Sequence, residues 1–196
     1  MTGVSTATNR CLVQIDALSG LLSQSTSLLP FYRKVVAELI TVRLAVSLEN
    51  CLSASFYRLA SGTVFESGRL PILHTQASSI SRARSLLLTG GSFNWLNGSD
   101  LCATLTLAFD PTDPCLANIR THSTTLAEIR KIRNHIAHRN RTSGPPFRQV
   151  VRRVYGKALN GVTPGTLLLT PRHVPRPLCD ALLIRSRVMI RDIFEK

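Results

Sequence analysis

Residues 125–140 read TLAEIRKIRNHIAHRN, and this pattern predicts a helix that begins near Leu126. Thr125 followed three residues later by Glu128 matches a capping box, in which the two side chains satisfy free N–H groups at the start of a helix. Apolar residues then recur at helical spacing, and no Gly or Pro interrupts the chain before 144–146. The predicted helix therefore has one apolar face and one cationic face.

The cationic face carries Arg133, Asn134 and His138. At about 100° per residue, Asn134 and His138 are offset by about 40° around the helix axis, whereas Arg133 and His138 are offset by about 140°. Arg133 and His138 can serve one site if the helix ends or distorts near His138. They can also do so if facing copies of the helix in a homodimer pool their side chains, which is the arrangement that we favour.

The spacing Arg133-Asn134-x-x-x-His138 resembles the R-N-x-x-x-H form of the motif of the HEPN family, the higher eukaryote and prokaryote nucleotide-binding domains. The flanking residues are similar too, with Ile132 before the Arg and Asn140 after the Ile-Ala-His run. The resemblance covers 126–140. It implies a small all-α bundle, frequent homodimers and RNA cleavage without a metal, commonly in toxins and antiviral defence proteins.

A longer segment, 31–60, contains Ser47-Leu48-Glu49 and resembles an early HEPN helix that carries an acidic residue toward the same cleft. The resemblance implies that Glu49 orients His138 or Arg133. One departure concerns HEPN toxins controlled by a nucleotidyltransferase antitoxin, which often have Tyr two residues after the His. Asn140 stands there in this chain, so control by that chemistry is not expected.

The residue types fit the chemistry of RNA cleavage. RNA carries its own nucleophile, so an enzyme must deprotonate the 2′-hydroxyl, stabilise charge on the phosphate and protonate the leaving 5′-oxygen. His138 is suited to proton transfer, Arg133 to charge stabilisation and Asn134 to fixing the orientation of the ring or a phosphate. No metal or cofactor is required. We expect the RNA backbone to be bound by Arg130, Arg139 and Arg141.

The charge of the chain supports a polyanionic partner. The formal net charge is +13 over 196 residues, and 20 of the 24 basic residues are arginine. The guanidinium group binds phosphate oxygens bidentately and stacks on bases. RNA is the favoured partner, and an acidic antitoxin or other regulatory protein is a second one. The length fits one HEPN-like domain over 1–196, with residues 1–7 loose.

The five cysteines are scattered without any C-x-x-C spacing, and this odd number of separated thiols favours a reducing cytoplasm. His135 and His138 are three residues apart, but no further cluster of ligands completes a metal site. No apolar run approaches the roughly 18 residues needed to span a bilayer, and no leader pattern is present. We therefore expect a cytoplasmic protein with no membrane partner.

Elsewhere the apolar spacing predicts helices over 9–29, 30–60, 76–88 and 177–194. The segment 149–170 contains Thr-Leu-Leu-Leu-Thr between Pro-Gly and Pro, which favours a small β-hairpin insert. The expected fold is thus an all-α, HEPN-like bundle with a hairpin near 149–170.

The leading hypothesis is a metal-independent HEPN endoribonuclease that acts as a toxin or defence effector. The alternative is a non-catalytic HEPN module that binds RNA, a nucleotide or a protein partner, and a basic helical DNA-binding protein is a third interpretation. The sequence lacks the motifs of P-loop NTPases, dinucleotide-binding dehydrogenases, α/β-hydrolases and zincins. Without the HEPN resemblance, the Arg and His residues would be interpreted as an ordinary solvated helix face.

Overall fold

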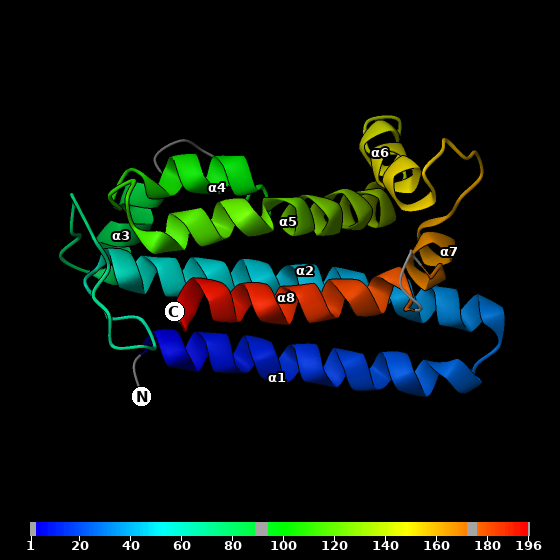
Figure 1. Ribbon diagram of the computed structural model, residues 1–196, viewed down its shortest axis with the longest axis horizontal. Helices are drawn as coiled ribbons and strands as arrows, with labels where there is room; N and C mark the ends of the chain where they lie inside the picture. Colours follow the sequence, from blue (N-terminus) through cyan, green and yellow to red (C-terminus); the bar gives the residue numbers. More distant parts are fainter. Residues whose placement is uncertain (1–2, 89–93, 172–175, 196) are drawn as a thin grey trace.

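The computed structural model describes residues 3–88, 94–171 and 176–195, and within them the protein is all-α. These residues contain no β-sheet, since their two β-bridges are isolated. The all-α class expected from the sequence is confirmed. Figure 1 shows long helices with nearly parallel axes and shorter helices packed near the two ends of the molecule.

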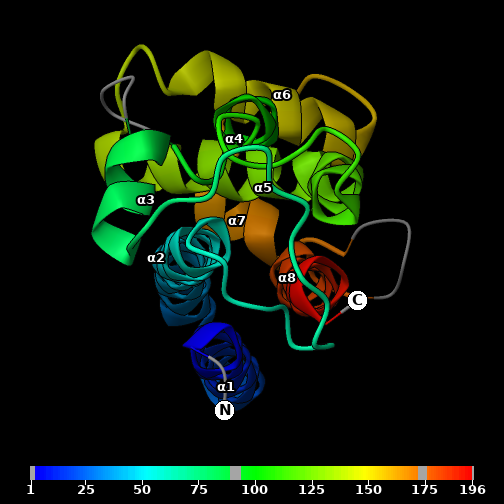
Figure 2. The same ribbon diagram turned by 90° about the vertical axis from the view of Figure 1, so that its left-hand side faces the viewer.

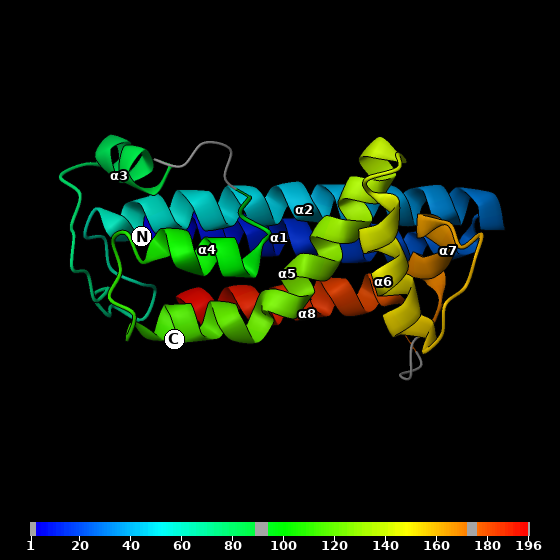
Figure 3. The same ribbon diagram turned by 90° about the horizontal axis from the view of Figure 1, so that it is seen from above.

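Four long helices form the body of the bundle: α1 (Gly3–Gln24), α2 (Pro30–Ala60), α5 (Pro114–His138) and α8 (Leu178–Phe194). The short 3-10 helix η1 (Ser25–Ser27) links α1 to α2. Figures 1 and 2 show α2 and α8 side by side, with α1 packed on one side of this pair and α5 on the other. Seen from above in Figure 3, α5 crosses obliquely over α2 and α8.

The longest helix, α2, lies at the centre of the core. Its buried residues recur at helical spacing, and the ring of Phe56 contacts Trp95, Phe109 and Phe194 at centroid distances of 6.4, 5.7 and 5.2 Å. Burying a large apolar side chain of this kind stabilises the fold by about 1.5–3 kcal/mol. Pro30 begins α2, as expected for a residue whose missing N–H is not needed in the first turn.

Four shorter helices complete the described part of the chain: α3 (Ile80–Leu87), α4 (Gly98–Leu105), α6 (Gly144–Tyr155) and α7 (Pro164–Leu169). Helix α4 packs on the first half of α5, and α7 packs on α2. Helix α6 follows α5 directly and crosses its C-terminal end at a steep angle (Figure 3). This crossing forms a cleft that three of the predicted site residues line, namely Arg130, Asn134 and His138.

The predicted start near Leu126 of the helix that carries Arg133 and His138 is wrong. Helix α5 begins at Pro114, where the Asp113 carboxylate accepts a hydrogen bond from the Cys115 N–H at 2.9 Å. Thr125 and Glu128 are buried in the middle of this helix and form no capping box. The pair matched a capping pattern by type, but the helix already had a stronger start in an Asp N-cap followed by Pro.

The predicted β-hairpin over 149–170 is also wrong, because this segment contributes to helices α6 and α7. Val150, Val151 and Val154 lie on one buried face of α6, which is helical rather than strand periodicity. Helix α7 begins where the Thr163 hydroxyl accepts a hydrogen bond from the Thr166 N–H. At the N-terminus, residues 3–7 form the first turns of α1 and are not loose.

Candidate functional site

Helix α5 ends at His138. The next residue, Arg139, adopts a left-handed conformation with φ of 41°, and its N–H donates to the His135 carbonyl at 3.0 Å. A left-handed residue after the last helical turn is a common way to stop a helix. The first of the two conditions left open by the sequence, that the helix ends near His138, is therefore met, whereas the homodimer stays a prediction.

A cleft of about 200 Å³ lies between the end of α5 and the start of α6. Arg130, Asn134 and His138 are four residues apart along α5, so they project from the same face of the helix. All three line the cleft, as does Lys131, and the opposite wall comes from Asn140, Thr142, Ser143 and Pro146. The small angle predicted between Asn134 and His138 around the helix axis agrees with their position on the same wall of the cleft. Lys131 is a further cation of this wall that was not predicted from the sequence.

Arg133 is not among the residues that line this cleft. Its Nη1 donates to the Asn134 Oδ1 at 3.0 Å, and its Nη2 lies 3.8 Å from the Glu49 Oε2. Both side chains of the ion pair are about one-third exposed, so the pair contributes at most about 1 kcal/mol to stability. The structure thus places Glu49 near Arg133 and connects Arg133 to the cleft through Asn134, while the orienting role of Glu49 stays a prediction. Among the described contacts, none joins Glu49 to His138.

The loop after α5 is held by Ser143. Its hydroxyl hydrogen-bonds to the His135 Nδ1 at 3.1 Å and to the Asn140 backbone, and its N–H donates to the Asn140 Oδ1 at 2.9 Å. The His135 ring stacks on Phe147 with centroids 4.4 Å apart. Burial, with the nearby charges of Arg139 and Arg148, lowers the pKa of His135 despite the opposing effect of Glu38. His135 therefore supports the wall of the cleft as a neutral ring.

The three arginines predicted to bind RNA lie in different surroundings. Arg130 lines the cleft. Arg139 is exposed, and its Nη2 donates to the Glu38 Oε2 at 2.9 Å. Arg141 is exposed in the loop and has no described ion pair. Arg130 is thus placed for direct contact with a ligand in the cleft, whereas Arg139 and Arg141 do not line it.

A buried carboxylate holds α6 and α8 against α5. Glu128 is only 2% exposed; Arg153 from α6 contacts one of its oxygens, and Arg185 from α8 lies 2.9 Å from the other. A neighbouring cleft of about 240 Å³ is lined by Glu128 and Lys131, and the Lys131 Nζ donates to the Gln149 Oε1 at 3.0 Å. Since Lys131 lines both clefts, they adjoin each other along the contact of α5 with α6.

Within the described ranges, no group of three His, Cys, Asp or Glu side chains gathers as a metal site. The same residues contain no helix long and apolar enough to cross a bilayer. All five cysteines are buried and form no disulfide. Comparison with protein-family models, curated protein sequences and solved structures finds no match.

Proposed function

We propose that this protein is a metal-independent endoribonuclease of the HEPN type, and that the cleft between α5 and α6 is its active site. The observation that carries the proposal is the convergence of His138, Asn134, Arg130 and Lys131 on one cleft where α5 stops. A titratable imidazole beside two fixed cations suits a reaction in which a proton moves while charge grows on a phosphate.

In the proposed reaction, His138 removes the proton from the ribose 2′-hydroxyl. The resulting oxygen attacks the adjacent phosphorus, the bond to the 5′-oxygen breaks, and water or a second His138 in a homodimer protonates that oxygen. The products are a 2′,3′-cyclic phosphate and a 5′-hydroxyl. Arg130 and Lys131 bind the non-bridging oxygens, while Asn134 fixes the orientation of the His138 ring or of the phosphate.

Arg133 and Glu49 have positioning roles in this scheme. The Arg133 guanidinium holds the Asn134 side chain by a 3.0 Å hydrogen bond, and Glu49 lies 3.8 Å from the same guanidinium. In a homodimer, Arg133 of one copy would also be available to the cleft of the other. The proposal includes a cytoplasmic setting, toxin or defence action and control by an antitoxin or regulatory protein.

The second candidate function is a non-catalytic HEPN module that binds RNA, a nucleotide or a protein partner at the same cleft. It is favoured by the position of Arg133, which contacts Asn134 and Glu49 instead of lining the cleft beside His138. A site that lacks this fixed charge is still a cationic surface for phosphate but has less stabilisation to offer a transition state.

The test is cleavage of a labelled mixed-sequence RNA in EDTA, with the product ends mapped. We expect the wild type to leave cyclic-phosphate ends, His138→Ala to lose about 10²–10⁴-fold in rate and Arg133→Ala to lose activity through the displaced Asn134. The control is Arg152→Ala, since Arg152 is exposed on α6 and lines neither cleft. If all four proteins bind the RNA equally and leave it intact, the enzyme proposal fails and the binding module replaces it.

A further inference from the structure

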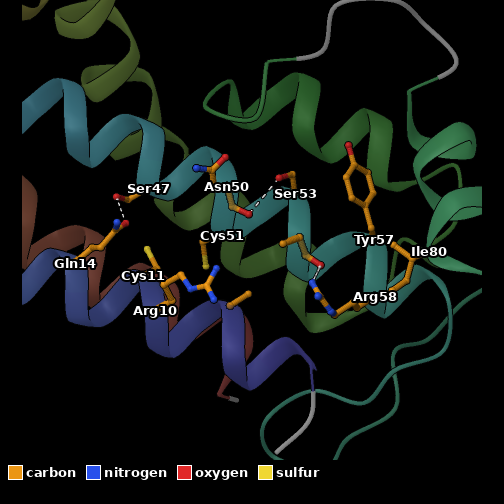
Figure 4. A pocket seen from close by; sticks show the side chains of 12 residues that line it. Arg10, Cys11, Gln14, Ser47, Asn50, Cys51, Ser53, Tyr57, Arg58 and Ile80 are labelled. Atoms are coloured by element: carbon orange, nitrogen blue, oxygen red, sulfur yellow. Dashed lines mark hydrogen bonds between the residues drawn. The ribbon is translucent and has the colours of Figure 1, made fainter.

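A second, larger groove lies between α1 and α2. Its volume is about 610 Å³, and it shares no lining residue with the cleft at His138. Figure 4 shows its walls: Arg10 and Gln14 come from α1, whereas Ser47 and Arg58 come from α2. A groove of this size lies within the range of about 300–1,000 Å³ that is typical of small-ligand sites.

The charged residues that line this groove are all positive. Of the twelve residues that line it, two are arginines and none carries a carboxylate. Arg10 makes no hydrogen bond or ion pair in the described part of the chain. The Arg58 Nη1 donates to the Ala54 carbonyl at 2.9 Å, and its Nη2 has no hydrogen-bond partner among the described residues. Two guanidinium groups in a lining that contains no carboxylate attract an anion.

The uncharged polar groups of the groove are also arranged to donate. The Ser47 hydroxyl donates to the Gln14 Oε1 at 2.5 Å, so the Gln14 Nε2 keeps its two donors for another partner. At the floor of the groove, the hydrogen bond between Cys11 and Cys51, together with burial, raises the pKa of the Cys51 thiol. This thiol is therefore neutral and adds no negative charge that would repel an anion.

We propose that the groove between α1 and α2 binds a phosphate group, carried by a free nucleotide or by a single-stranded nucleic acid. Arg10 and Arg58 supply the positive charge, and the Gln14 amide supplies a directed donor. The volume of about 610 Å³ exceeds what inorganic phosphate alone would fill, so there is room for the nucleoside attached to the phosphate. This site is independent of the proposed ribonuclease activity because none of its residues belongs to the cleft at His138.

The experiment measures the binding of a fluorescein-labelled, single-stranded DNA octamer by anisotropy, with unlabelled AMP as the competitor. DNA lacks the 2′-hydroxyl, so the proposed ribonuclease chemistry cannot cut the probe. The sharpest variant is Gln14→Glu, which keeps the acceptor for Ser47 but places a carboxylate in the groove. The second variant, Arg10→Gln, removes the unpaired cation.

Matched controls are Gln24→Glu and Arg152→Gln. They make the same changes of charge at exposed positions that lie outside the groove. We expect each groove variant to bind the probe at least about tenfold more weakly than its control, because a charge change within about 4–5 Å of a phosphate is worth at least that much in a partly screened site.

The two probes identify the source of the phosphate. Weaker binding of both the octamer and AMP in the groove variants assigns the site to a free nucleotide, and weaker binding of the octamer alone assigns it to a nucleic-acid strand. The proposal is overturned if the groove variants bind both probes as tightly as their controls, or if the wild type binds neither. Loss of RNA cleavage in the earlier test would leave this result unaffected.

Discussion

Replacing Glu128 by Gln removes one negative charge from between two arginines and leaves the volume of the side chain nearly unchanged. The carboxylate joins three helices, since it contacts Arg153 from α6 and lies 2.9 Å from Arg185 of α8. We expect Glu128→Gln to lower the free energy of unfolding, because the variant leaves two cations facing each other across a neutral amide.

The magnitude follows from the burial of the three groups. Removing one partner of a fully buried ion pair costs about 3–5 kcal/mol. Glu128 is 2% exposed, but the side chains of Arg153 and Arg185 are 38% and 32% exposed, so water partly solvates their charges. The Gln oxygen also retains one acceptor. A loss of about 2–3 kcal/mol is therefore expected, which moves the urea midpoint down by about 1–1.5 M for a slope near 2 kcal/mol/M.

The assay is urea unfolding followed by circular dichroism at 222 nm, with Glu195→Gln as the control. Glu195 is exposed and lies 3.7 Å from Arg191, so its replacement should change stability by no more than about 0.5 kcal/mol. The Gln variant also separates the ion-pair role of Glu128 from the capping box that the sequence predicted. A capping box accepts Gln as readily as Glu, so the substitution would not weaken it. If Glu128→Gln unfolds at the same urea concentration as Glu195→Gln, the buried ion-pair network is not stabilising the fold and the reasoning is refuted.

Two further perturbations test the packing and the support of the cleft. Gly98→Ala should lower the thermal midpoint of unfolding, because its new methyl group would lie 2.6 Å from the Cβ of Ser123 and overpacking costs about 1–3 kcal/mol. The control Gly20→Ala, whose methyl group meets no atom within 4 Å, should instead raise this midpoint. Equal shifts in the two variants would contradict the close packing of α4 on α5. The lowered pKa of His135 means that the unfolded chain binds this proton more readily, so stability should fall as the pH drops below about 6.5. In urea titrations over that range His135→Gln should show a smaller decrease than the wild type, and parallel decreases would exclude a contribution from His135.

The sequence was sufficient for the elements whose pattern is long and local. Helix α2 runs over the predicted range 30–60, and α8 begins and ends within a residue of the predicted 177–194. Short segments were less predictable, because a few apolar residues between Pro and Gly fit a strand as well as a helix. The helical spacing of Phe147, Val150, Val151 and Val154 could have predicted α6. The six-residue helix α7 is decided by its packing against α2, which no local pattern specifies.

The candidate site shows the same division. The shared face of Arg130, Asn134 and His138 follows from helical geometry alone. The path of the loop after α5 does not follow from helical geometry, because Arg139 takes a left-handed conformation that its residue type does not favour. The true role of Glu128 was equally hidden, since its partners come from two helices that follow later in the chain.

Glu128 and His138 lie on the same uninterrupted helix, so the direction in which His138 projects from α5 is fixed relative to the buried Glu128. The two residues are ten positions apart, which corresponds to about 15 Å along the axis. Inserting or deleting one residue between them would turn His138 by about 100° relative to the anchored half of the helix. Every side chain of the cleft would still be encoded, yet the imidazole would face elsewhere. What a lineage of such proteins would have to keep between these two points is the number of residues, in addition to the identity of Arg130, Lys131 and Asn134, which line the cleft.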